Sequence, residues 1–352
     1  MTILISVILF FFVVGFQGNC DNDDKKEVPS TSKSPAANVE VTPVDPSLFL
    51  KENLLSEIAT EDCTLSDGTK STCYKVVVKG EPQEHKMGPW CPERIDDGKD
   101  KGGIWFRDGE IFDVDGKFIA NLDKFYNDPV WKLYRDDGTV RVTKSQQACE
   151  AAAKPDVAEE FNNYCVECSP TFYKDFKTTY LIPITPIYKK NISQLGRRPP
   201  RGERPPRPPR GERPPPGRGG GGRGQPLGLA LNGVRFDPPA PVDAILDAHT
   251  LAPLDDCGGH VNPNEGYHYH AAKGCTKEAE QKEKHSPLLG YALDGFGIYS
   301  RLDKEGNATE GLDQCGGHTV KNIGYHYHAG KPGDNQIIGC LHGAGGRVNV
   351  LK

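Results

Sequence analysis

Cys257-Gly-Gly-His260-Val-Asn-Pro-Asn-Glu-Gly-Tyr267-His-Tyr-His-Ala271 recurs with the same spacing as Cys315-Gly-Gly-His318-Thr-Val-Lys-Asn-Ile-Gly-Tyr325-His-Tyr-His-Ala329. The two copies start 58 residues apart. Each copy follows a Leu-Asp pair and precedes a Gly-Cys pair, so the repeats extend over 254–275 and 312–340. Chance does not produce such a duplication, and it predicts two related folding units.

Each Tyr-His-Tyr-His segment predicts a pair of histidines on one face of a strand. Side chains alternate between the faces of a β-strand, so both histidines lie on one face and both tyrosines on the other. The Gly-Gly pair upstream permits a sharp turn that returns a third imidazole to this pair. The sequence therefore predicts a three-histidine set in each repeat, and the two sets can pair into one histidine-rich site.

These histidines are the candidate metal ligands. Neutral imidazole is the commonest protein ligand of metals and suits zinc, copper, iron and nickel. We expect a copper or zinc site made by the repeat histidines His260, His268, His270, His318, His326 and His328. A second interpretation stays open, in which Tyr and His are hydrogen-bonded core residues and Gly-Gly and Cys fix the turns. The two interpretations differ in whether at least three of these imidazoles meet at one point.

The same part of the chain resembles the YHYH domain family of extracellular proteins. The resemblance rests on the doubled Tyr-His-Tyr-His and on three motifs in the family's order, at 226–234, 286–299 and 337–340. A looser similarity to the family's upstream region covers 80–90 and 182–186. Where the family has Gly-Phe-Pro-Ile-Tyr-Gly, this chain has Gly297 and Ser300, which predicts a differently shaped loop.

The resemblance implies no activity that can be transferred to this chain. The sequence contains no nucleophile elbow, no His-Glu-x-x-His and no phosphate loop. It therefore identifies no catalytic residue, and whether the protein is an enzyme stays open. A carboxylate beside a metal-bound histidine often orients the imidazole. Asp294 is a candidate for that role, although a plain Asp-Gly turn is the favoured interpretation.

Residues 1–20 predict a secretory signal peptide. An apolar run from Thr2 to Gln17 ends in small and polar residues before an acidic stretch, and it is short for a membrane span. The run lacks a basic start, and a lipoprotein anchored through Cys20 is the alternative. We expect a secreted, extracellular protein with no membrane span after removal of the signal. Sequons at Asn191 and Asn307 are compatible with a glycoprotein.

Loss of Cys20 with the signal leaves ten cysteines, an even set that indicates disulfides formed in an oxidising compartment. Within the repeats, the expected pairs are Cys257 with Cys275 and Cys315 with Cys340. Each bridge closes a loop around its own Tyr-His-Tyr-His and is worth about 3 kcal/mol. Cys63 is expected to pair with Cys73 across a Ser-Asp-Gly turn.

The remaining cysteines do not reveal their connectivity. Cys165 and Cys168 have the spacing of a zinc half-site, but no second Cys-x-x-Cys is present to complete one. We therefore expect disulfides for both residues.

The segments before the repeats differ in composition. Residues 21–55 are acidic, then rich in Ser, Thr, Pro and Lys, and predict a disordered tether. Residues 60–190 predict an antiparallel, hairpin-rich β region, because short β-branched and aromatic runs such as 130–134 alternate with Asp-Gly turns. The Asp-Gly steps begin at residues 67, 97, 108, 115 and 137. The run around 145–164 predicts a helix that breaks at Pro155.

Residues 196–225 form a linker that contains the nine-residue repeat Arg-Pro-Pro-Arg-Gly-Glu-Arg-Pro-Pro at 198–206 and 207–215. Nine Arg and two Glu give the linker a charge of +7, whereas the whole chain carries −5. Prolines favour extended polyproline II structure and leave nothing to bury in a core. We expect a disordered spacer. A polyanionic glycan or an acidic surface is the partner class that its charge fits, and nucleic acid is not expected in a secreted protein.

Taken together, the sequence predicts a β-rich, disulfide-bonded fold, mainly antiparallel with minor helix. One globular unit is interrupted by the disordered Arg/Pro/Gly linker, and residues 226–352 form the YHYH domain. In that domain we expect a strand and Asn-Gly turn at 227–234, a short helix at 242–249 and a strand pair at 288–299. We expect a metal-binding secreted protein. The alternative is a non-enzymatic binding or matrix protein with structural repeats.

Overall fold

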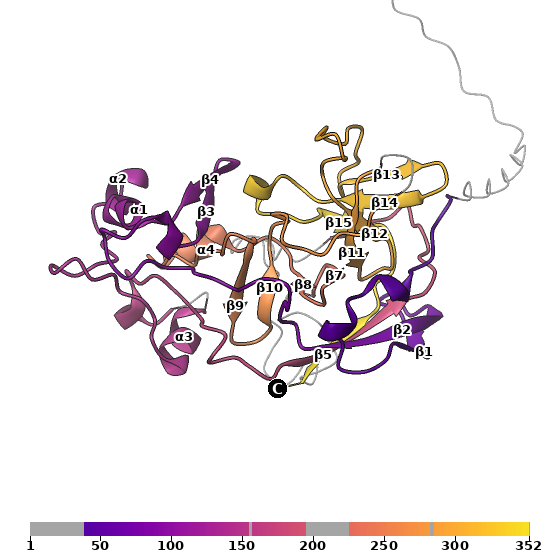
Figure 1. Cartoon of the computed structure of the whole chain (residues 1–352), viewed down its shortest axis with the longest axis horizontal. Coiled ribbons are helices and arrows are strands. Elements are labelled where there is room, and N and C mark those ends of the chain that lie inside the picture. Colours follow the sequence, from indigo (N-terminus) through magenta and orange to yellow (C-terminus); the bar gives the residue numbers. More distant parts are fainter. Residues whose placement is uncertain (1–38, 155–156, 195–224, 282–284, 352) are drawn as a thin grey trace, which may run out of the picture. The chain divides into compact units, whose positions relative to one another are not determined.

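A computed structural model describes residues 39–154, 157–194, 225–281 and 285–351. Residues from Val39 onward form one compact unit (Figure 1). The signal peptide, residues 21–38 of the predicted tether and residues 196–224 of the predicted linker lie outside the described residues. The β-rich, mainly antiparallel and disulfide-bonded fold class is confirmed.

An eight-stranded sheet forms the centre of the unit, in the order β13-β14-β12-β11-β7-β8-β10-β9. Its strands are β7 (Gly228–Ala230), β8 (Arg235–Phe236), β9 (Gly259–Asn262), β10 (Gly266–Tyr269), β11 (Leu288–Ala292), β12 (Gly297–Tyr299), β13 (Gly317–Val320) and β14 (Gly324–His328). Neighbouring strands are antiparallel except for the pairs β8 with β10 and β12 with β14, which are parallel. The hairpins β9–β10 and β13–β14 therefore lie at opposite ends of the sheet (Figure 1).

The sheet consists of two similar halves that meet where β7 pairs with β11. Gly228 pairs with Ala292, and their counterparts Gly290 and Ala230 pair in the reciprocal way. A Cβ on Gly228 would lie 2.2 Å from the Tyr291 carbonyl oxygen, and one on Gly290 would lie 2.3 Å from that of Leu229. These contacts explain why both seam positions are glycine, and they extend the repeat beyond the Cys-Gly-Gly-His motif to the whole half-sheet.

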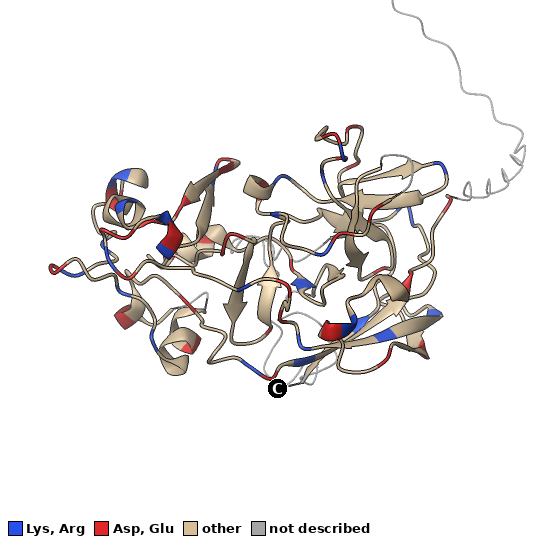
Figure 2. Ribbon diagram, viewed as in Figure 1, with Lys and Arg blue, Asp and Glu red and all other residues tan. Residues whose placement is uncertain are grey.

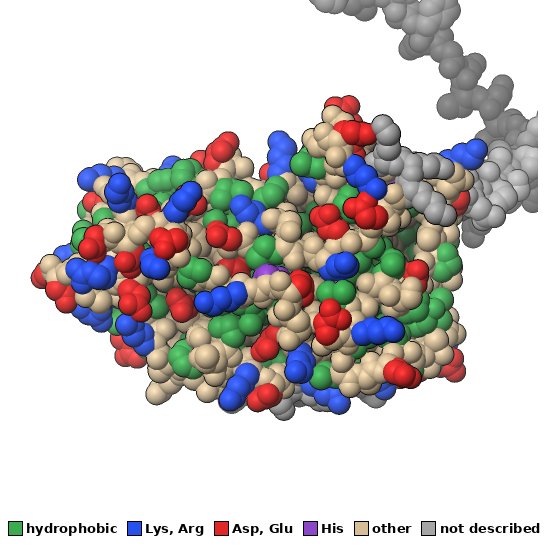
Figure 3. Space-filling model, viewed as in Figure 1, with side chains coloured by type: hydrophobic (Ala, Val, Ile, Leu, Met, Phe, Trp, Pro, Cys, Tyr) green, Lys and Arg blue, Asp and Glu red, His purple; other side chains and the backbone are tan. Residues whose placement is uncertain are grey.

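Charged residues are nearly absent from the central sheet. Figure 2 shows that they concentrate in loops, short helices and the outer strands. Among the eight central strands, Arg235 in β8 is the only Lys, Arg, Asp or Glu. On the face seen in Figure 3, positive and negative side chains are interspersed and little histidine is visible.

A second, antiparallel sheet has the order β1-β2-β5-β16 and shares one hydrophobic core with the central sheet. Its strands are β1 (Ala59–Thr64), β2 (Lys70–Val78), β5 (Lys177–Pro183) and β16 (Arg347–Leu351). Val76 and Tyr180 contribute to this core from the second sheet, and Leu229 and Phe236 contribute from the central sheet. The segments on the two sides of residues 195–224 therefore fold together.

The other elements are short. Two small ladders pair β3 (Ile104–Arg107) with β4 (Glu110–Asp113) and β6 (Ser193–Gln194) with β15 (Cys340–Leu341). The α-helices of the described residues are α1 (Gly116–Ala120), α2 (Leu122–Phe125), α3 (Gln146–Ala152) and α4 (Val242–Asp247). Single 3-10 turns are η1 (Pro46–Leu48), η2 (Lys51–Asn53), η3 (Lys99–Lys101), η4 (Glu159–Phe161) and η5 (Pro332–Asp334). None of the helices in the described part of the chain is both long and apolar enough to cross a membrane.

Local predictions are confirmed where turn or cap chemistry is strong. Asp108 and Gly109 both have positive φ and join β3 to β4, as an Asp-Gly hairpin turn requires. Ser145 caps α3 by accepting a hydrogen bond from the Ala148 amide. The strand and Asn-Gly turn at 227–234, the strand pair at 288–299 and the helix at 242–249 also form within the predicted ranges.

Two local predictions were wrong. Asp115 is not in a hairpin turn, because its carboxylate accepts a hydrogen bond from the Phe118 amide and caps α1. Residues 130–134 contain no strand, only an isolated bridge between Tyr134 and Val140. An Asp residue fits a helix cap as well as it fits a hairpin turn. An aromatic run fits a packed loop as well as it fits a strand.

The five disulfides include all three predicted pairs, Cys63–Cys73, Cys257–Cys275 and Cys315–Cys340. The other two are Cys91–Cys165 and Cys149–Cys168. Cys165 and Cys168 thus bond to different partners, in agreement with the expectation that they are not a zinc half-site.

Residues 39–55 belong to the predicted tether, but they pack against the fold. Val44 and Phe49 are buried. The Val44 amide donates to the Ile184 carbonyl, and the Leu50 amide donates to the Leu231 carbonyl. This stretch therefore contacts the chain just after β5 and just after β7.

Candidate metal centres

The first histidine cluster forms on hairpin β9–β10. His268 lies directly across from His260 in the ladder, and His270 follows two positions later on the same face. The Nε2 atoms are 3.1 Å apart for His260 and His268, 3.1 Å for His268 and His270, and 3.2 Å for His270 and His260. The predicted alternation and the return of the third imidazole are confirmed.

The second cluster repeats this arrangement on hairpin β13–β14. His326 lies directly across from His318, and His328 follows it. The three Nε2–Nε2 distances are 3.0 Å for His318 and His326, 3.1 Å for His326 and His328, and 3.1 Å for His328 and His318.

The two sets do not combine into one site. In the sheet, β12, β11, β7 and β8 lie between the two hairpins, and the histidines of the hairpins form separate groups. The expectation that both sets pair in a single histidine-rich site was therefore wrong. The seam between the half-sheets runs through β7 and β11, which places each Tyr-His-Tyr-His strand away from the other.

In four of these histidines, the hydrogen bond made by the other ring nitrogen, Nδ1, fixes the tautomer. Nδ1 of His268 donates to the Gly266 carbonyl at 3.0 Å, and Nδ1 of His270 donates to the Pro238 carbonyl at 2.6 Å. In the second cluster Nδ1 of His326 donates to Gly324 at 2.9 Å, and Nδ1 of His328 donates to Ser300 at 2.8 Å. A carbonyl can only accept, so Nδ1 carries the proton and Nε2 of the neutral ring presents a lone pair.

Burial keeps these rings neutral. It lowers the pKa of His326 to about 3 and that of His328 to about 4. Burial also lowers the pKa of His260 and His268 well below the usual value, and neighbouring imidazoles reinforce the effect. Burial lowers the pKa of His270 and His318 as well.

This arrangement fits a bound transition-metal ion. Three Nε2 lone pairs within 3.2 Å of one another cannot all be satisfied by a single proton. Around zinc, whose bonds to His nitrogen are about 2.0–2.1 Å, tetrahedral ligands lie about 3.3 Å apart. Donation of Nδ1 to a carbonyl is also the usual arrangement of metal-binding histidine. The donor set is entirely imidazole, which suits zinc or copper.

The tyrosine face explains the Leu-Asp pair before each motif. The Tyr267 hydroxyl donates to Asp255 Oδ2 at 2.8 Å, and the Tyr325 hydroxyl donates to Asp313 Oδ2 at 2.8 Å. The other oxygen of each carboxylate accepts from the amides of the motif's Cys and second Gly. Each Asp thus ties the Cys-Gly-Gly-His turn to the back of the strand that carries its own Tyr-His-Tyr-His.

The second tyrosine of each strand binds the turn of the preceding hairpin. Asn232 Nδ2 donates to the Tyr269 hydroxyl at 3.1 Å, and the Tyr327 hydroxyl donates to Asp294 Oδ2 at 2.8 Å. The Asp294 carboxylate also accepts from the Gly343 amide at 2.9 Å, whereas the Nδ1 atoms of His326 and His328 donate to backbone carbonyls. The suggestion that Asp294 orients a ligand histidine was therefore wrong, and the Asp-Gly turn is confirmed.

His285 joins the second cluster and was not among the predicted ligands. Its Nε2 lies 3.1 Å from Nε2 of His326, and its Nδ1 donates to the Ser286 carbonyl at 3.0 Å. His285, His318, His326 and His328 together form a four-imidazole group. His285 lies outside the duplicated motif, and repetition could not reveal it because the first half has no counterpart.

The first cluster has different neighbours. Arg235 and Asp237 form a buried ion pair, and Asp237 Oδ2 lies 3.8 Å from Nε2 of His268. Asp237 is nevertheless not part of the group of ligand atoms formed by His260, His268 and His270.

The remaining histidines have other partners. His249 pairs with Asp128 at 2.9 Å. His342 stacks on Tyr188 at 4.8 Å, and His85 packs on Tyr269 at 6.3 Å. Two further groups place a histidine near Cys257 and Cys275 or near Cys315, but these cysteines are in disulfides and cannot act as thiolate ligands.

Comparisons with known proteins give one family. A family model described as YHYH protein matches residues 220–310, which include the first Tyr-His-Tyr-His and His285 but end before the second. No curated protein gives a significant match, and no solved structure does. The match covers the first Tyr-His-Tyr-His and the motifs at 226–234 and 286–299, but not the motif at 337–340. Residues 220–310 of this chain are therefore similar to the family described as YHYH protein.

Proposed function

We propose that this is a secreted transition-metal-binding protein with two metal centres, one in each half of the central sheet. One observation carries the proposal. Six neutral, largely buried imidazoles form two sets whose Nε2 atoms are 3.0–3.2 Å apart. A hydrogen-bonded polar core would distribute these lone pairs among donors, whereas a cation satisfies all of them together.

Zinc and copper are the proposed ions. Both accept an all-imidazole donor set, whereas calcium and magnesium prefer oxygen. The ligands of the first centre are His260, His268 and His270, and those of the second are His318, His326 and His328 with His285.

Secretion is supported by cysteine chemistry. All ten cysteines of the described residues are in disulfides, which persist in oxidising compartments. Expression in a secreting host should yield a protein that starts after the apolar leader. Amino-terminal sequencing that finds residues 1–20 still attached would contradict this part of the proposal.

Metal analysis tests the centres. The secreted protein, equilibrated with zinc or copper and desalted, should hold two ions per chain. His268→Ala/His270→Ala and His326→Ala/His328→Ala should each hold one, and the four-fold variant should hold none. His249→Ala is the matched control, because His249 lies outside both clusters, and should hold two.

The opposite result is equally clear. If the wild-type protein holds no ion while its disulfides and cooperative unfolding are intact, the repeats are structural. The alternative binding or matrix function would then be favoured, and retention on heparin with and without residues 197–223 would be the next measurement.

A further inference from the structure

The two candidate centres are built on equivalent scaffolds but have different surroundings. In the first half, the parallel pairing of β8 with β10 places Arg235 beside His268. In the second half, the parallel pairing of β12 with β14 places Ile298 beside Tyr327 and Tyr299 beside His328. The positions equivalent to Arg235 and Asp237 are therefore Gly297 and Tyr299. An ion pair in one half is replaced by a glycine and an aromatic ring in the other.

This replacement makes room for His285. The His285 ring packs edge-on against Tyr299 at 4.8 Å and against His326 at 4.8 Å. A Cβ on Gly297 would lie 2.7 Å from the Tyr299 ring and 2.9 Å from Leu288 Cδ1, so a side chain there would displace the ring that supports His285. The local sequence thus favours a fourth imidazole at the second centre.

No such ligand completes the first centre. Among the described residues, the group that includes His260, His268 and His270 contains no fourth histidine, cysteine or carboxylate. Asp237 stands nearby, but its carboxylate is held by Arg235. Arg235 is also the only formally charged residue in the central strands, and its side chain is only 8% exposed. A buried Arg-Asp pair costs desolvation energy that a hydrophobic pair would avoid, so it points to a role at this position.

We propose that the two centres differ in function. The first is a three-imidazole site that leaves one position for a small exchangeable anion, beside the Arg235–Asp237 pair. The second is closed by His285 and holds its ion without an external ligand. Three neutral imidazoles leave the charge of a divalent ion uncompensated, which favours an anion. This inference rests on the proposed function, because it requires both centres to bind metal.

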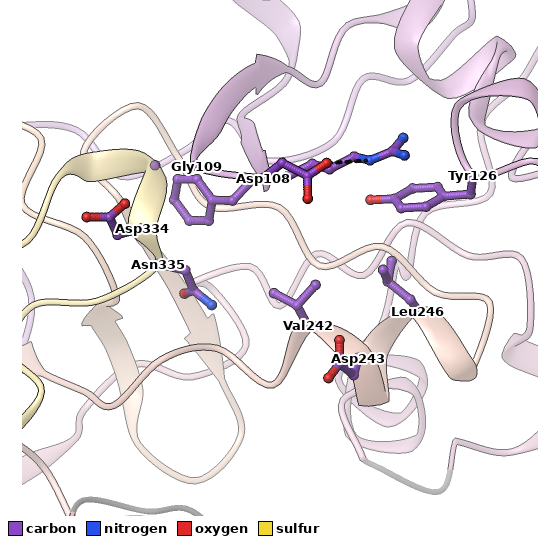
Figure 4. A pocket seen from close by; sticks show the side chains of 11 residues that line it. Asp108, Gly109, Tyr126, Val242, Asp243, Leu246, Asp334 and Asn335 are labelled. Atoms are coloured by element: carbon purple, nitrogen blue, oxygen red, sulfur yellow. Dashed lines mark ion pairs between the residues drawn. The ribbon is translucent and has the colours of Figure 1, made fainter. Parts of the chain in front are cut away.

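The neighbouring pair suits an anionic ligand. The guanidinium of Arg235 supplies positive charge, and the carboxylate of Asp237 can accept a hydrogen bond from a protonated ligand atom. Arg235 also lines a surface groove of about 620 Å³, together with Glu61, Lys75 and Glu265. A second groove of about 470 Å³ lies between α4, η5 and the β3–β4 hairpin (Figure 4). The residues that line it belong to neither histidine cluster.

Azide binding to the cobalt-loaded protein tests the inference. Cobalt(II) occupies zinc-type sites and has visible absorption that changes when a ligand is added. The wild-type protein loaded with two cobalt ions should bind one azide per chain. The variant His326→Ala/His328→Ala, which keeps the first centre, should still bind one, and His268→Ala/His270→Ala should bind none. His285→Ala opens the second centre and should raise the stoichiometry to two.

Each other outcome has a separate meaning. Two azides or none on the wild-type protein with two bound cobalt ions would overturn the inference but leave the proposed function intact. So would one azide that persists in His268→Ala/His270→Ala. Failure to bind cobalt, zinc or copper would overturn the proposed function itself. If His285→Ala does not fold, the wild-type stoichiometry and the two double variants still decide.

Discussion

The two glycines of Cys-Gly-Gly-His have different roles. Gly316 has a φ of +84°, in the left-handed region that favours glycine. Gly317 does not have positive φ, but a Cβ there would lie 2.1 Å from the Tyr325 hydroxyl. Its lack of a side chain lets Tyr325 reach Asp313. Gly258 and Gly259 repeat this division in the first half.

Gly317→Ala should therefore destabilise the second half of the sheet, even though the substitution adds only one methyl group. The methyl group displaces the Tyr325 hydroxyl, and overpacking of this kind costs about 1–3 kcal/mol. Urea unfolding measures the loss, and metal analysis should show release from the second centre only. Gly98→Ala is the control, since Gly98 is exposed and extended, and it should change the free energy of unfolding by less than about 0.5 kcal/mol. Equal effects of both changes would disprove the packing explanation.

Asp294 gives a pH-dependent prediction. Burial raises the pKa of its carboxyl to about 6, compared with about 3.9 in an unfolded chain. A raised folded-state pKa contributes stability that is complete below the unfolded value and is lost as the pH rises through about 6. Asp294→Asn removes this titration. The free energy of unfolding of the wild-type protein relative to the variant should therefore fall by about 2 kcal/mol between pH 4.5 and 7.5.

Urea unfolding of both proteins across that pH range provides the measurement. The histidines are the same in both, so their protonation cancels in the difference. A constant difference over the whole range would mean that Asp294 does not titrate with a raised pKa.

At the level of elements, each histidine cluster is made by one hairpin and one disulfide. The register of β9 with β10 sets His260 across from His268, and a slip of one residue would move His260 to the tyrosine face. Cys257–Cys275 closes the loop that contains this hairpin, and the Cys257 amide donates to Asp255.

Cys257→Ser/Cys275→Ser should destabilise the protein and impair one centre. An 18-residue separation between the bridged cysteines predicts a loss of about 3 kcal/mol. Metal content should fall from two ions to one at limiting metal, because the first hairpin loses its constraint. Cys63→Ser/Cys73→Ser is the matched control. It removes a disulfide of the second sheet and should lower the melting temperature without loss of metal. Retention of both ions by the first variant would show that the hairpin alone fixes the ligands.

At the scale of the whole molecule, the pseudo-twofold seam joins the two histidine-bearing hairpins through one core. Metal bound to the folded state and not to the unfolded chain stabilises the fold, by about 2.7 kcal/mol when the free metal is at 100 times its dissociation constant. Both centres should therefore contribute to the stability of a single cooperative unit.

Removal of metal by a chelator should lower the melting temperature of the intact protein by several degrees per centre. Each double histidine variant should lose about half of this effect, and the four-fold variant should not respond to the chelator. Differential scanning calorimetry with and without chelator makes the comparison. A wild-type melting temperature that is unchanged by a chelator that removes both ions would show that metal binding is not coupled to folding.

The sequence by itself determined the local features of this protein. Period-two alternation predicted the shared face of the histidines, the Asp-Gly and Asn-Gly steps predicted the hairpins of both half-sheets, and loop closure predicted three of the five disulfides. These signals lie within short windows, where backbone geometry alone decides which side chains meet. The similarity of 228–233 to 290–295 was also readable and would have revealed the longer repeat.

Only the tertiary structure decided how these parts combine. The pairing of β7 with β11 separates the two clusters, and the approach of His285 to His326 spans 41 residues. Arg235 reaches the first cluster through a parallel pairing of β8 with β10 that no local pattern reports. Long-range strand order depends on the core shared by the whole unit, and the difference between a three-imidazole and a four-imidazole site depends on that order.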